Sequence, residues 1–130
     1  MSGLSPEVLA LVLADAVHHD DVSGKLFILG TRAEIEAAEF PYRHPRLAAY
    51  VALVEGRGEM LLRIRLIDSD EELAPLAIEE SVVSFDHPLA ELQVVAEFTD
   101  VEFPEPGDYR LQLYVDGQFL RERRIIVSGK

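Results

Sequence analysis

Apolar and charged side chains alternate along three segments of the chain. In residues 60–66 the even positions are apolar and Arg63 and Arg65 lie between them, and residues 91–98 and 109–116 alternate in the same way. A period of two, with charged residues on one side, is typical of a strand that buries one face. These three segments are therefore predicted to be half-buried β-strands.

Turn signals separate the apolar runs. Residues 55–58 (Glu-Gly-Arg-Gly) predict a short hairpin, and Asp116-Gly117 is a pair favoured in two-residue type I′ turns. Two prolines bracket residues 40–45, and two more stand in residues 103–107, so both segments are predicted to be loops.

Two segments allow alternative interpretations. Ser5-Pro6-Glu7 resembles a helix start, but the following apolar positions alternate, and a polar loop at residues 18–25 leads to a second apolar run at residues 26–29. We therefore predict a strand and a hairpin here. In residues 118–127, Arg121 and Arg123 share the parity of apolar positions. Either a β-bulge near Arg121–Arg123 resets the register, or charges point inward on an edge strand.

The count of elements favours one all-β domain. Eight or nine short strands with regular turns and no long helix predict a single antiparallel two-sheet β-sandwich over residues 1–130. The chain has no cysteine, which excludes disulfides and Cys-based zinc or redox sites. The N-terminal run lacks the positive charge of a secretory signal and no run reaches the length of a membrane span, so a cytoplasmic location is expected.

Several longer segments resemble a known family. They are LALVLADAV, GKLFILGT, FPYRHPRLAAYVAL and FPEPGDYRLQLYVDG, and together they span most of the chain. The chain is similar to an uncharacterised family of short bacterial proteins with an immunoglobulin-like β-sandwich. The resemblance implies that fold and no particular activity. Ala14 departs from it, because such sequences often carry cysteine there. Tyr109 resembles the corner tyrosine of immunoglobulin-like domains, and the alternative is an ordinary core tyrosine.

The net charge of −12 limits the partners. It disfavours nucleic acids and anionic membranes, both of which bind basic surfaces. Acidic residues are concentrated between Leu66 and Tyr109, a stretch without Lys or Arg, and basic residues flank it. Basic strands are expected to neutralise neighbouring acidic strands. The alternative is an acidic face that meets a basic partner.

Two clusters suggest metal ligands. Residues 18–21 (His-His-Asp-Asp) are adjacent in sequence and would point apart on a strand end, so a zinc-type site would need a distant ligand such as His44 or His87. Residues 68–72 (Asp-Ser-Asp-Glu-Glu) are rich in oxygen ligands but lack the spacing of the helix–loop–helix calcium motif. No metal site and no cofactor is therefore predicted, and calcium at the acidic turn is kept as an alternative.

The loop at residues 40–46 is the candidate binding site. Tyr42, Arg43, His44 and Arg46 offer donors suited to a carboxylate or an acidic peptide. The sequence contains neither a G-x-S-x-G motif nor a phosphate-binding glycine loop, so no enzymatic activity is predicted. The predicted function is a non-enzymatic interaction or self-association module. One form of self-association would be a homodimer that pairs through a strand edge. The alternative is a calcium- or small-ligand-binding domain.

Overall fold

The structure, a computed structural model, describes residues 5–130. These residues contain nine β-strands. They are β1 (Glu7–His19), β2 (Leu26–Thr31), β3 (Glu34–Ala37), β4 (Tyr42–Val54), β5 (Gly58–Asp68), β6 (Ala77–Phe85), β7 (Leu92–Phe103), β8 (Gly107–Val115) and β9 (Gln118–Gly129). Within this part of the chain, no helix is long and apolar enough to cross a membrane. The all-β prediction and the N-terminal strand are confirmed, and the helix suggested by Ser5-Pro6-Glu7 does not form.

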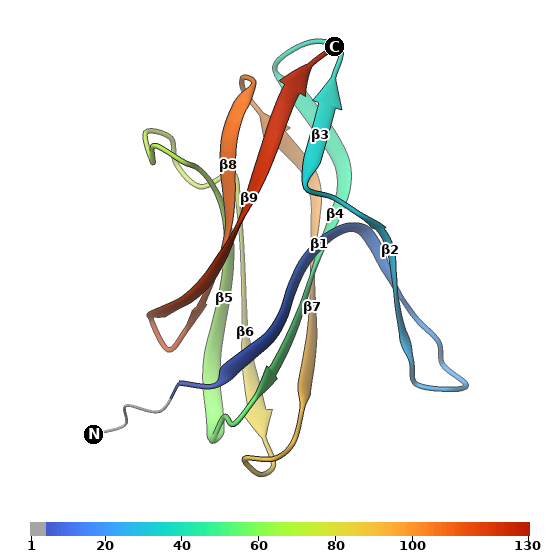
Figure 1. Cartoon of the computed structure of the whole chain (residues 1–130), viewed down its shortest axis with the longest axis vertical. Coiled ribbons are helices and arrows are strands. Elements are labelled where there is room, and N and C mark those ends of the chain that lie inside the picture. Colours follow the sequence, from blue (N-terminus) through green and yellow to red (C-terminus); the bar gives the residue numbers. More distant parts are fainter. Residues whose placement is uncertain (1–4) are drawn as a thin grey trace.

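The strands form two facing sheets (Figure 1). One has the order β2-β1-β4-β7, and the other, which is curled, has the order β3-β9-β8-β5-β6. Neighbouring strands are antiparallel except β3 and β9, which are parallel. The prediction of wholly antiparallel sheets is therefore wrong at β3. After Thr31 the chain crosses to the other sheet, where it runs alongside β9 instead of returning along β2.

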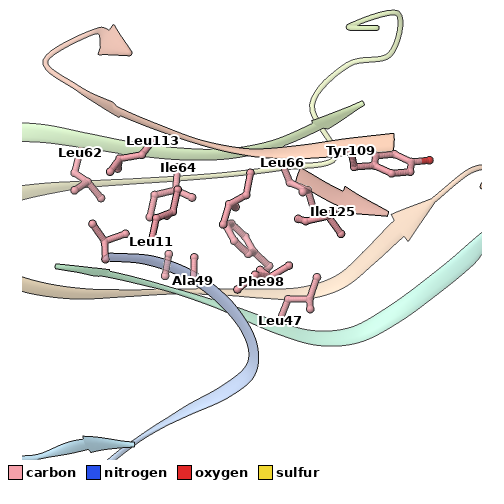
Figure 2. Close-up of a cluster of buried hydrophobic side chains, with 14 of the residues drawn as sticks. Leu11, Leu47, Ala49, Leu62, Ile64, Leu66, Phe98, Tyr109, Leu113 and Ile125 are labelled. Atoms are coloured by element: carbon pink, nitrogen blue, oxygen red, sulfur yellow. The ribbon is translucent and has the colours of Figure 1, made fainter. Parts of the chain in front are cut away.

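One hydrophobic core lies between the sheets. Figure 2 shows Leu62, Ile64 and Leu66 of β5 facing side chains of the other sheet. Phe103 and Tyr109 pack edge to face, with ring centroids 5.1 Å apart. The predicted buried positions of the three alternating segments contribute directly to this core, including Leu62, Ile64, Leu66, Ala96, Phe98, Tyr109, Leu111, Leu113 and Val115.

Two connections show how the sequence directs the chain. Asp116 and Gly117 have φ values of 50° and 79°, and they link β8 directly to β9, as expected for a type I′ turn. The hydroxyl of Tyr109, a residue only 2% exposed, donates a hydrogen bond to the carbonyl of Glu105 at 2.6 Å. Tyr109 therefore fixes the loop that precedes β8.

Both explanations for the phase break in β9 are correct in part. The register shifts where Leu113 pairs with Arg121 and Tyr114 pairs with Phe119, so the extra residue is Leu120, just before the predicted position. Beyond the shift, Arg123 lies opposite the buried Leu111 and donates a hydrogen bond to the carbonyl of Leu11 in the other sheet at 3.1 Å. An inward-pointing arginine thus bridges the two sheets at this open side.

The predicted loop at residues 40–45 is wrong from Tyr42 onward, because β4 begins there. Proline is normally confined to sheet edges because it has no N–H to donate. Pro45 satisfies this rule: β1 pairs with β4 only as far as the pair Ala14–Ala48, so β4 is an edge on that side at Pro45. The second predicted loop is confirmed between Phe103 and Gly107.

Candidate functional site

The first sheet divides where β1 leaves β4. From Glu7 to Ala14, β1 pairs with β4, but beyond Ala14 it pairs, among the described residues, only with β2. Residues 15–31, here called the arm, therefore form a two-stranded hairpin that projects away from the two sheets (Figure 1). The predicted hairpin is confirmed, and the point where β1 and β4 separate is here called the fork.

Strand β2 is the outermost strand of its sheet and is almost entirely exposed. Phe27 is 47%, Ile28 is 36% and Leu29 is 51% exposed, although consecutive residues of a strand point to opposite faces. Apolar side chains are therefore in solvent on both faces of the arm. No residue of β2 carries a charge.

A polar cluster fills the fork. Arg32 donates two hydrogen bonds to the carboxylate of Asp15, from Nε at 2.8 Å and from Nη2 at 3.1 Å. Nε2 of His44 lies 3.8 Å from Asp15 Oδ1, and Nδ1 of His44 lies 3.0 Å from the hydroxyl of Tyr42. The cluster therefore joins the base of the arm to β4.

Gly30 gives the cluster its space. The pairs on either side, Ala14–Thr31 and Ala16–Leu29, place Gly30 opposite Asp15. Gly30 has a φ of 70°, and a Cβ atom there would lie 2.6 Å from Asp15 Oδ2. Only glycine combines this backbone conformation with room for the carboxylate.

The ionisation of the cluster follows from its contacts. The hydrogen bonds from Arg32 hold the pKa of Asp15 below its usual range, and Asp15 raises the pKa of Arg32. Burial lowers the pKa of His44 from its ordinary value of 6.5; the charge of Arg32 adds to this effect and Asp15 partly opposes it. At neutral pH the cluster therefore contains an Asp–Arg ion pair and a neutral imidazole.

The structure brings together only part of the predicted binding site. Tyr42 and His44 lie in the fork, whereas Arg43 pairs with Glu102 at 3.2 Å and Arg46 is exposed, with no ion pair to another residue of the described chain. These four residues do not converge on one ligand. Strand alternation turns Arg43 away from Tyr42 and His44 and toward Glu102, and Arg46 remains exposed outside the cluster.

Sequence reasoning missed Asp15 and Arg32 as members of the cluster. The hairpin could have indicated Asp15. A loop at residues 20–25 sets a register in which Asp15, at the end of an apolar run, lies opposite Gly30. An acid in an apolar strand, opposite a glycine, indicates a side chain that needs room and a cation.

The two metal candidates are not arranged to hold an ion. In the hairpin loop, His19 contacts Asp21 at 3.4 Å and Asp20 accepts the backbone N–H of Ser23 at 2.9 Å. In the acidic turn, Asp68 accepts the backbone N–H groups of Glu72 and Leu73, and thereby holds its own loop. Within residues 5–130, no three His, Asp or Glu side chains are grouped as metal ligands.

Some acidic side chains pair with arginines within the fold. Asp108 accepts a hydrogen bond from Arg124 at 2.9 Å, and the expected pairing of basic and acidic strands recurs between β5 and β6 and between β4 and β7. The expected neutralisation holds for four of the thirteen acidic residues between Leu66 and Tyr109, and the acidic face stays a prediction. The pairs drawn from the acidic stretch are Arg63–Glu80, Arg65–Glu71, Arg43–Glu102, Arg110–Asp108 and Arg124–Asp108.

We expect His44 to make the folded protein less stable in mild acid. Its pKa is lower in the folded state, so the unfolded chain binds the proton first. The contribution is complete above pH 6.5 and is lost as the pH falls from there through the folded-state pKa. Urea unfolding at pH 8 and at pH 5.5 would measure it.

The matched variants are His44→Gln and His18→Gln, because the His18 side chain is exposed and makes no hydrogen bond within the described chain. Lower pH also reduces the repulsion of a chain with net charge −12, so the difference between variants is the relevant quantity. His44→Gln should lose less stability than wild type on acidification, and His18→Gln is the control for loss of a histidine outside the cluster. Equal pH dependence in all three proteins would contradict the assignment.

Comparisons with known proteins identify a family and similar folds. Part of the alkylpurine DNA glycosylase AlkC of Pseudomonas fluorescens, solved bound to DNA containing an abasic site analog, is similar with a TM-score of 0.53 and 14% identity over 74% of this chain and 28% of that one. Part of a β-glucosidase from Listeria innocua is similar with a TM-score of 0.50 and 15% identity over 95% of this chain and 16% of that one.

At these identities the likeness shows the fold alone, and the chain spans less than a third of the length of either enzyme. No curated protein matches the sequence. The family model of DUF6941, described as a family of unknown function, matches residues 9–128. These residues include the arm, the fork and both sheets. The chain therefore belongs to DUF6941, a family of unknown function.

Proposed function

We propose that this chain is a non-enzymatic interaction module that binds an extended segment of another polypeptide along the free edge of β2. A strand added to a sheet edge gains main-chain hydrogen bonds, and its side chains are selected by the surface beside the edge. The observation that carries the proposal is the apolar, uncharged and exposed β2 at the end of its sheet.

The other sheet ends differ from β2 in ways that discourage pairing. Strand β3 has only four residues. Strand β6 carries Glu79 and Glu80, and β7 carries Glu97, Asp100 and Glu102. Short length and charge are the usual protections of an edge strand. Strand β2 has six residues and neither protection, and exposed apolar edges of this kind are sites of association.

The cluster in the fork supports a structural role for its histidine. His44 is 8% exposed, and its ring lies between Tyr42 and Asp15. Asp15 is in turn held by Arg32. The polar atoms of His44 and Asp15 therefore face other residues of the cluster, whereas an acid–base catalyst must direct such atoms to a substrate. We therefore assign the cluster to positioning the arm, and we propose no enzymatic activity.

We also propose an immunoglobulin-like relationship and a cytoplasmic location. The Tyr109 hydrogen bond to Glu105 at the start of β8 and the sheet order support the first. The absence of cysteine is compatible with the second. No specific observation favours the calcium- or small-ligand-binding alternative, because Asp68 serves its own turn.

A labelled peptide with the sequence of residues 25–32 tests strand addition. We expect fluorescence anisotropy to show saturable binding at micromolar concentrations. Two isomers of the peptide can be made, each N-methylated at every second amide. Each isomer lacks the N–H donors of one of the two edges of the extended peptide. Because pairing uses one edge, one isomer should bind like the unmodified peptide and the other should not. Equal binding of both isomers, or none of the unmodified peptide, would refute the proposed function.

A further inference from the structure

We infer that the occupant of the β2 edge is a second copy of this chain, paired with its own β2 antiparallel about a twofold axis. This inference rests on the proposed function. The apolar block from Leu26 to Leu29 is continuous, so antiparallel self-pairing places apolar residues opposite apolar residues in each register centred on the block. A twofold contact of this kind uses the same patch on both copies and closes at the dimer.

The charge distribution favours contact between arms. The arm together with Arg32, which follows it, contains three acids (Asp15, Asp20 and Asp21) and two bases (Lys25 and Arg32), a net of −1 out of the −12 of the chain. The remaining −11 lies on the rest of the molecule, from which the arm projects (Figure 1). Antiparallel pairing of two arms would hold the two acidic bodies on opposite sides of the axis. Any contact between the bodies themselves would bring like charges together.

The arm itself lacks the strands that make a ribbon stable. Beyond the fork it consists of β2 and the end of β1 alone, and isolated two-stranded hairpins are marginal in water. Pairing with a second arm makes a four-stranded ribbon and extends the sheet to the order β7-β4-β1-β2-β2-β1-β4-β7. A second copy is also the one partner that is present wherever the chain is present. Because six-residue strands form a small contact, we expect a dimer of micromolar affinity.

Sedimentation of the full chain from about 1 to about 200 µM, a range that brackets micromolar affinity, tests the inference. We expect a monomer–dimer equilibrium, and we expect Ile28→Lys and Ile28→Glu each to weaken it at least about tenfold, because like charges meet near the axis. An equimolar mixture of the two variants should recover dimers, and added salt should reduce this recovery. Recovery also shows that both variants are folded. Val82→Lys, at an exposed apolar position of β6 (67%), is the matched control and should dimerise like wild type.

The outcomes separate the two proposals. A chain that stays monomeric at the highest concentration, or dimers unaffected by Ile28→Lys, would overturn the second-copy inference. If the chain stays monomeric but the peptide of residues 25–32 still binds with the one-edge pattern, strand addition stands and the second-copy inference alone fails. If neither dimer nor peptide binding is seen, both proposals fail.

Discussion

Replacing Gly56 by alanine is expected to destabilise the protein by roughly 2–3 kcal/mol, the upper part of the range for overpacking a well-packed site. Gly56 lies in the turn between β4 and β5, and the ring of Phe85 covers it. A Cβ atom at Gly56 would overlap three carbons of that ring. Phe85 is only 4% exposed and closes this end of the core, so it has little freedom to move. Urea unfolding at pH 8 measures the loss.

The controls separate overlap from backbone strain. Gly58, two residues further on, has a φ of 60° and open space around a Cβ. Gly58→Ala should therefore cost only about 1–2 kcal/mol, through its backbone conformation. Phe85→Leu removes the ring atoms that the new methyl group at position 56 would meet, so Gly56→Ala should cost less in that background than in wild type. Strictly additive effects of the two substitutions would contradict the steric explanation.

The alternating strands could be predicted from the sequence because their burial follows from local pattern. Residues 60–66 bury their even positions, as Ile64 illustrates. Residues 109–115 bury the predicted odd positions, such as Leu111, and Gln112 is buried as well. The turn at Asp116-Gly117 follows from the conformations these two residues tolerate. Local chemistry and tertiary packing agree at these positions.

The hairpin of the arm could be predicted but its exposure could not, because the exposure of β2 depends on pairing elsewhere in the sheet. Residues 26–29 resemble any buried strand, and they are exposed only because β1 leaves β4 after Ala14. The cluster of Tyr42, His44, Asp15 and Arg32 could not be predicted either, because it also depends on the separation of β1 from β4. Pro41 and Pro45 indicate a loop, yet the fork leaves an edge at which Pro45 is accommodated within β4, and this strand aligns Tyr42 with His44. The parallel pairing of β3 with β9 likewise depends on a crossing between sheets that no local pattern records.

Replacing Gly30 by alanine is expected to cost roughly 2–3 kcal/mol, because two penalties coincide. A non-glycine residue at a φ of 70° is strained, and the new Cβ would displace the Asp15 carboxylate from Arg32. Gly24→Ala is the matched control, since Gly24 has a φ of 75° with no atom within 4 Å of a Cβ. It should lose only the backbone part, about 1–2 kcal/mol.

A double-mutant cycle with Asp15→Ala measures the second penalty. Once the carboxylate is absent, Gly30→Ala should cost no more than Gly24→Ala, and the coupling between positions 15 and 30 should be about 1 kcal/mol. Denaturant unfolding of the four proteins gives this coupling. A coupling of zero would mean that Gly30 is needed for its backbone conformation alone. In that case the fork would be held by the course of the strands, and the contact between Gly30 and Asp15 would have no share in placing the arm.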